Sequence, residues 1–175
     1  MFKKFGSLCL AGLLAMTFVG CSDHDEIDDL IIDFAPIQIN VMAESQDGKD
    51  LLNPTVEGNL LTQNIKAVYR GEEYTNGASS KSRVYLPKFF GLITVKLQNG
   101  KYAGKYALSF GELDGGKDFK NEEIVIDWGD GKQDVITFSN TVKWEGQNPD
   151  ITSSFQLNGK TVATDTPTPV MKVVK

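Results

Sequence analysis

Very few side chains in this sequence have the chemistry of a catalytic nucleophile, a base or a metal ligand. His24 is the only histidine among 175 residues, and the two cysteines are Cys9 and Cys21. This composition disfavours a Ser–His–Asp triad, a Cys–His pair and a multi-histidine zinc site, since each needs an imidazole in a folded site. The 23 acidic residues leave carboxylate-only chemistry open. The spacing of these acids along the chain does not indicate which two would form a catalytic pair. No catalytic residue, metal ligand or cofactor is therefore predicted, and a non-enzymatic role is expected.

Cys21 follows a segment with the three parts of a secretory signal. Lys3 and Lys4 are basic, Leu8–Val19 is apolar, and Gly20 is the small residue before the cysteine. A transmembrane helix needs about 20 apolar residues, which is more than this run offers. Residues 1–20 are therefore predicted to be a cleaved signal peptide, and its loss would also remove Cys9. The remaining chain would then form no internal disulfide.

The four residues Phe18-Val19-Gly20-Cys21 resemble the lipobox of bacterial lipoproteins, although leucine is more usual at the position of Phe18. The resemblance implies that the Cys21 sulfur is acylated and that the chain is cut before it. The partner at this end would be a membrane, bound through lipid. An ordinary secretory signal with a chance cysteine is the alternative.

An acidic segment starts directly after Cys21. Ser22, Asp23, His24, Asp25 and Glu26 resemble the export signal of surface lipoproteins of the Bacteroidota. The resemblance implies display on the outer face of the outer membrane, and periplasmic retention is the alternative. Residues 21–33 are predicted to be a solvated acidic tether, since like charges repel. The whole chain carries a net charge of −5, which argues against a nucleic-acid partner.

Residues 34–175 are predicted to form one all-β domain, an immunoglobulin-like β-sandwich of about eight to ten short strands. Ile37, Ile39 and Val41 alternate with polar or less apolar residues, as in a half-buried strand. Two-residue hairpin turns are predicted at Asn-Gly and Asp-Gly pairs, which tolerate positive φ. These pairs are Asn99-Gly100, Asp130-Gly131 and Asn158-Gly159. A helix within residues 51–64 is weakened by Pro54, Gly58 and Asn59.

Residues 126–131, Ile-Asp-Trp-Gly-Asp-Gly, resemble the signature of PKD domains, which are extracellular sandwiches. That resemblance implies a spacer or adhesion module. An Asp130-Gly131 turn would place Asp127 opposite Asp134, so a calcium site of Asp127, Asp130 and Asp134 is one hypothesis. A solvated hairpin tip beside Lys132 is the other, and residues 114–118 are predicted to be a polar loop.

The candidate ligand-binding residues are Trp128, Trp144 and Asp130. Exposed tryptophans stack on sugar rings, whereas buried ones belong to the core of a sandwich. Three functions stay open: a lipoprotein with a non-catalytic binding or accessory role towards a glycan or an outer-membrane protein; a structural or adhesion module that uses a sheet edge; and a small carboxylate-dependent glycoside hydrolase. An exposed aromatic platform would favour the binding role. A long unpaired edge strand would favour the adhesion module, and two facing acids in a cleft would favour the hydrolase.

Overall fold

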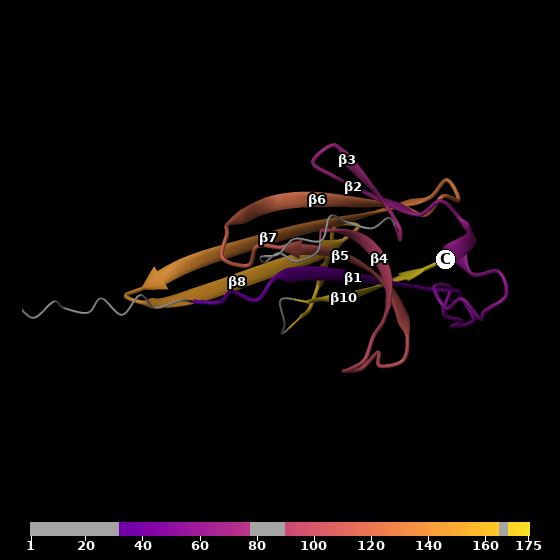
Figure 1. The fold of residues 1–175 in the computed structure, drawn as a ribbon, viewed down its shortest axis with the longest axis horizontal. Coiled ribbons are helices and arrows are strands. Elements are labelled where there is room, and N and C mark those ends of the chain that lie inside the picture. The colour runs from indigo at the N-terminus through magenta and orange to yellow at the C-terminus, as the bar shows by residue number, and fades with distance from the viewer. Residues whose placement is uncertain (1–31, 78–89, 165–167) are drawn as a thin grey trace, which may run out of the picture. The chain divides into compact units, whose positions relative to one another are not determined.

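The computed structural model describes residues 32–77, 90–164 and 168–175 (Figure 1). Within these ranges the chain forms ten β-strands and one short 3-10 turn, and no α-helix. None of its described helical structure is long and apolar enough to cross a membrane. The predicted signal peptide, Cys21 and residues 22–26 lie outside the described residues.

One sheet has four strands in the order β10-β1-β5-β4. β1 lies in the middle and pairs antiparallel with β5 and parallel with β10. The strands are β1 (Ile37–Glu44), β4 (Gly91–Lys96), β5 (Tyr106–Leu113) and β10 (Val170–Val174).

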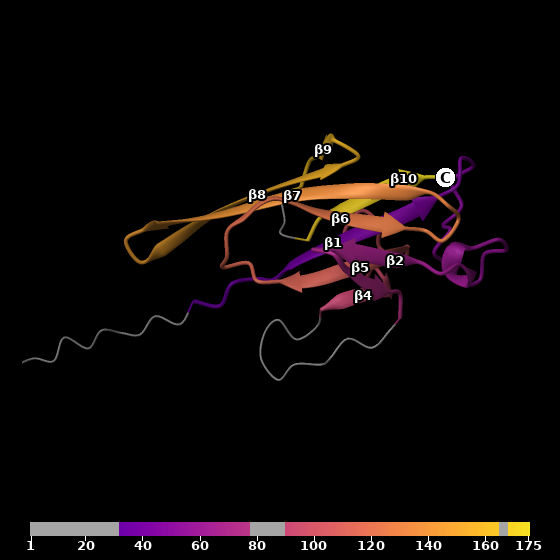
Figure 2. The ribbon, with the colours of Figure 1, turned by 90° about the horizontal axis from the view of Figure 1, so that it is seen from above.

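The other sheet has six strands in the order β3-β2-β6-β7-β8-β9, and all of its pairings are antiparallel. Its strands are β2 (Lys66–Tyr69), β3 (Glu72–Thr75), β6 (Phe119–Asp127), β7 (Gln133–Glu145), β8 (Asn148–Leu157) and β9 (Lys160–Val162). The long β7–β8 pair extends past the ends of the other strands (Figure 2).

The two sheets pack face to face around one hydrophobic core, which confirms the predicted all-β sandwich. The alternation of β1 buries Ile37, Ile39 and Val41 against the core side of the second sheet. That side contributes alternate residues of β6 and β7, among them Ile126 and Phe138. The number of described strands also agrees with the predicted range.

Of the turns predicted at Asn-Gly pairs, one is confirmed and one is wrong. Leu157 pairs with Lys160 across Asn158-Gly159, whose φ angles are 50° and 73°, so this two-residue turn is confirmed. The turn predicted at Asn99-Gly100 is wrong, because the β4–β5 ladder already ends at Lys96 and Tyr106. Residues 97–105 form a longer loop instead. The Gly104 N–H donates to the Leu97 carbonyl at 2.7 Å, which closes that loop before the Asn-Gly pair reaches the ladder.

Residues 51–64 contain only the turn η1 (Leu60–Thr62), capped by the Asn59 side chain. The sequence prediction missed one element altogether, the paired ends of β7 and β8 over residues 141–145 and 148–153. These ends are mostly exposed, so they lack the buried alternation that marks the other strands.

Candidate functional site

Trp128 is a core residue and not a ligand platform. Its side chain is fully buried (0% exposed) below the β6–β7 loop, and its indole Nε1 donates to Asp134 Oδ2 at 2.7 Å. The loop packs so closely that a Cβ on Gly129 would lie 2.8 Å from the Asn64 backbone nitrogen. Two hypotheses were open for Trp128, an exposed ligand platform and a core residue, and its burial excludes the first and supports the second.

Asp134 is the centre of a buried polar cluster beneath Trp128. Asn158 Nδ2 donates to Asp134 Oδ1 at 2.7 Å, and Lys175 Nζ lies 3.2 Å from Asp134 Oδ2. The same ammonium group lies 4.5 Å from the centre of the Trp128 ring. Burial alone would raise the pKa of the Asp134 carboxyl, but the three hydrogen bonds outweigh burial and hold that pKa below its usual value.

Two of the carboxylates proposed for calcium, Asp127 and Asp130, accept hydrogen bonds from the local backbone, whereas Asp134 is bound by side chains. Asp127 opposes Gln133 and Asp134 opposes Ile126, so the predicted pairing of Asp127 with Asp134 is wrong. The loop is longer than two residues, because the Trp128 N–H bonds to the Lys132 carbonyl at 3.2 Å. The Asp130 side chain is exposed and accepts a hydrogen bond from the Lys132 N–H at 2.9 Å. Within the described part of the chain, no group of three or more histidine, cysteine or acidic residues is placed to hold a metal.

Trp144 has the opposite environment. It lies on the part of the β7–β8 hairpin that extends past the sandwich, which we call the arm (residues 141–145 and 148–152). Its side chain is 55% exposed, and that of Ile151 is 43% exposed. Of the sequence-derived candidates, Trp144 is the one that the structure places on the surface as a large apolar group.

The arm is amphipathic because its strands continue the alternation of the core. Phe138 and Asn140 point inward, and two-residue periodicity puts Val142 and Trp144 on the same face. Ile151 and Pro149 lie opposite these two residues and share that face. The other face is polar: Thr141, Lys143, Glu145, Asn148, Asp150 and Thr152. The apolar face of the arm therefore continues the residue pattern of the core-facing side, but no strand of the four-stranded sheet lies across from it.

The base of the arm is fixed by polar contacts with the 114–118 loop. The Asn140 amide donates to the carbonyls of Gly115 and Lys117 at 3.1 and 2.8 Å. Asp118 Oδ1 accepts a hydrogen bond from the Val142 N–H at 2.8 Å. Residues 114–118 thus form the predicted polar loop and also hold the first residues of the arm in place.

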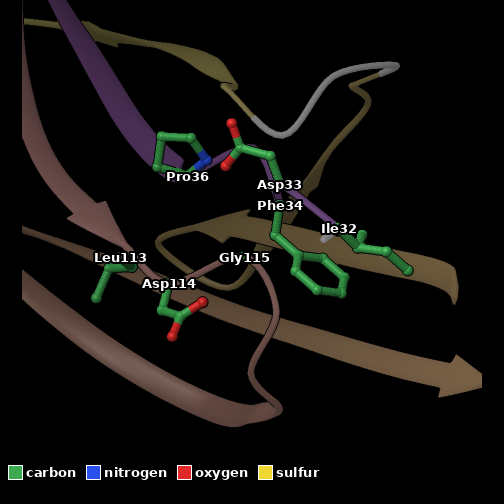
Figure 3. A pocket seen from close by; sticks show the side chains of 7 residues that line it. All are labelled: Ile32, Asp33, Phe34, Pro36, Leu113, Asp114 and Gly115. Carbon is green, nitrogen blue, oxygen red and sulfur yellow. The ribbon is translucent and has the colours of Figure 1, made fainter. Parts of the chain in front are cut away.

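Phe34 contacts the arm from the segment that leads into β1. Its ring meets the Trp144 ring edge-on, with 6.0 Å between centroids. Beside it lies a small pocket of about 190 Å³, in which Ile32, Asp33, Phe34 and Pro36 face the segment of residues 113–115 (Figure 3). Phe34 and Ile151 were missed as site residues, although the alternation of Val142 with Trp144 and of Pro149 with Ile151 was a readable signal.

One edge of the arm has free backbone groups. β8 pairs with β7 along its whole length, but β9 covers only Phe155–Leu157. The Val142 N–H donates to Asp118 and so points away from β8, which makes Val142 and its opposite residue Ile151 a non-hydrogen-bonded pair. The backbone groups of Ile151 and of alternate residues on either side of it therefore point away from β7. These residues are Pro149, Ile151 and Ser153. No described strand pairs with them, and proline, which has no N–H to offer, is typical of such an edge.

Comparison of the chain with protein-family models, with curated proteins and with solved structures found no match. The resemblances to lipoproteins and to PKD domains therefore stay predictions that rest on the residues quoted for them.

Proposed function

We propose that this chain is a lipid-anchored, non-catalytic binding protein that recognises a protein partner through the arm. The observation that carries the proposal is the open edge of β8 beside an exposed apolar face. The free N–H and C=O groups of Ile151 and Ser153 offer hydrogen bonds to an added strand. Trp144 and Ile151 offer apolar contacts on the adjoining face. Edge and face together fit an extended peptide segment of a partner protein.

The anchor supports a partner at the membrane. In this proposal lipid on Cys21 holds the protein on the outer membrane, and residues 22–26 direct it to the cell surface. Residues 21–33 limit the distance between Cys21 and Phe34 to about 45 Å even when fully extended. Since Phe34 contacts Trp144, the arm stays within reach of proteins in the same membrane. An outer-membrane protein therefore fits the arm better than a soluble ligand.

Position-specific photo-crosslinking in the native cells tests the arm. A photoreactive residue at position 149 or 151 is expected to give one crosslinked product of defined mass, because both side chains lie on the apolar face of the arm beside the open edge. A probe at Lys143, on the polar face of β7, is the matched control and is expected to give none. Ile151→Pro removes the free N–H and is expected to reduce crosslinking from position 149 at least tenfold.

Trp144→Ser is expected to reduce the same product without unfolding the protein, since the ring is largely exposed. Equal labelling from positions 143, 149 and 151 would contradict recognition by the edge. A product with the mass of two copies of this chain would show that the arm pairs with itself and would refute a separate partner.

The lipid anchor at Cys21 and the export signal in residues 22–26 are tested separately. Metabolic labelling with an alkyne fatty acid is expected to mark the protein and to be lost completely in Cys21→Ser. Externally added protease is expected to cleave the wild type on intact cells. The variant Asp23→Ala/Asp25→Ala/Glu26→Ala is expected to be protected yet still lipid-labelled, and Asp28→Ala/Asp29→Ala serves as the charge control. A wild-type protein that is protected on intact cells would refute surface display.

A further inference from the structure

A second candidate site lies on the outer face of the four-stranded sheet, away from the hydrophobic core. The inward residues of this sheet include Ile39, Phe110 and Leu92. The residues between them point outward and line a groove of about 490 Å³. Among its lining residues are Gln38, Asn40, Ile93, Val95, Ser109 and Thr168. No residue of the arm lines this groove, so it is independent of the proposed partner site.

Two buried polar side chains of the groove have no hydrogen-bond partner. Asn40 and Ser109 are each only 7% exposed, and they lie opposite one another on β1 and β5. Within the described residues, no hydrogen bond of either side chain is found. Among the described residues, the Tyr69 hydroxyl is the one fully buried side-chain oxygen or nitrogen without a partner, so the polar atoms of Asn40 and Ser109 still reach the solvent in the groove. Unused donors and acceptors in a groove are available to a ligand.

Asn140 is an example of a buried side-chain amide in this protein whose hydrogen bonds have a structural role. It is 1% exposed, and it donates to two backbone carbonyls and accepts a hydrogen bond from Ser153 Oγ at 2.6 Å. Asn40 has the same chemistry and nearly the same burial but none of these contacts. The difference indicates that the Asn40 amide is not required to hold the fold together.

The lining chemistry favours a neutral ligand rich in hydroxyl groups. Directly opposed residues on antiparallel strands have Cβ atoms about 5 Å apart, so Asn40 and Ser109 present an amide and a hydroxyl side by side. Ile93 follows Ser109 in the same row across the sheet, and it adds an aliphatic surface with Val95.

Charge and backbone geometry narrow the ligand class further. Lys96 and Glu112 contribute one charge of each sign to the groove, so neither anions nor cations are selected. A sheet face also exposes no free backbone groups to an extended peptide, because they are used within the ladder. We propose that this groove binds a neutral carbohydrate, whose hydroxyls reach Asn40 and Ser109 and whose C–H faces rest on Ile93 and Val95.

Thermal unfolding with matched substitutions tests whether these side chains are reserved for a ligand. Asn40→Leu and Ser109→Ala are expected to leave the melting temperature unchanged or to raise it by a few degrees, about 2–4 °C. The matched controls Asn140→Leu and Ser153→Ala remove fully used groups and are expected to lower it, the first by about 10 °C. A loss in Asn40→Leu as large as that in Asn140→Leu would show a structural role and overturn the proposal.

Binding is tested on the whole protein in a detergent without a sugar headgroup. The probes are cellotriose, maltotriose, xylotriose, mannotriose and chitotriose at up to 50 mM, followed by amide shifts in two-dimensional NMR. At least one trisaccharide is expected to shift the side-chain amide signals of Asn40 and Gln38. Asn40→Leu is expected to raise the dissociation constant at least tenfold, whereas Trp144→Ser leaves it unchanged. Shifts from none of the probes, or equal binding by Asn40→Leu, would overturn the proposal.

Discussion

Replacing Trp128 with alanine is expected to lower the free energy of unfolding by about 3–5 kcal/mol, the usual cost of deleting a large buried aromatic side chain. The side chain is 0% exposed, so its loss leaves a cavity below the β6–β7 loop. The deletion also leaves Asp134 without the indole donor and Lys175 without the ring that it faces. A loss of this size is a large part of the stability of a domain of this length.

Urea unfolding followed by circular dichroism measures this effect. Trp128→Phe separates its two causes, because phenylalanine keeps most of the buried volume but has no N–H to donate. Its expected loss is intermediate, about 1–3 kcal/mol. Trp144→Ala is the matched control, and its expected loss is about 0.5 kcal/mol, since the ring is 55% exposed and meets Phe34 only edge-on.

Fluorescence gives a second measurement of the same contrast. The emission of Trp144→Ala, which reports Trp128, is expected to be blue-shifted and protected from iodide. The emission of Trp128→Phe, which reports Trp144, is expected to be red-shifted and strongly quenched. Equal quenching of the two variants would contradict the burial described for Trp128.

Replacing Asp134 with alanine is expected to cost about 3–5 kcal/mol, because it leaves the nearly buried Lys175 ammonium group without its counter-ion. The side chains of Lys175 and Asp134 are 9% and 10% exposed, so water compensates little of the loss. The double variant Asp134→Ala/Lys175→Met removes both charges and is expected to recover at least half of it. Asp130→Ala, in the exposed loop nearby, is the control and is expected to cost less than about 1 kcal/mol.

The contribution of Asp134 also depends on pH with a defined sign. Its pKa is lower in the folded protein than in the unfolded chain, so the charged form favours folding. This contribution is fully present above the unfolded pKa of about 3.9 and is lost as pH falls through the lower folded pKa. The stability difference between wild type and Asp134→Asn is therefore expected to be constant from pH 7 to 5. It is expected to shrink below pH 4, and a difference that grows towards acid would contradict the network.

Local residue pattern predicted the sandwich well because alternation and turn chemistry act within a few residues. The alternation of Ile37, Ile39 and Val41 gave β1, and Asn158-Gly159 gave the β8–β9 turn with its register. The turn predicted at Asn99-Gly100 was wrong because contacts outside the dipeptide determine the loop. Its loop is closed by hydrogen bonds between Leu97 and residues 104 and 105, and a local dipeptide preference does not contain that information.

The candidate site depended far more on tertiary contacts. Trp128 and Trp144 have the same chemistry, and only the position of a second sheet decides which of them is covered. The four-stranded sheet lies over the first part of β7 and ends before Val142. Inward-facing residues of β7 are therefore part of the core up to Asn140, whereas those of the same alternating pattern beyond it lie on the surface. Likewise, nothing local distinguishes Asn40, whose side chain has no hydrogen bond within the described residues, from Asn140, whose side chain has three.

The sequence by itself determined the class of the chain: an all-β domain without imidazole chemistry, after a segment that resembles a lipoprotein leader. Composition and local periodicity carry that information, because they depend on residues that are close in the chain. Tertiary structure decided which tryptophan is exposed, which edge of β8 is open and which buried amide lacks a partner. These properties depend on residues far apart in sequence, as in the ion pair that joins Asp134 to Lys175 at the last position of the chain.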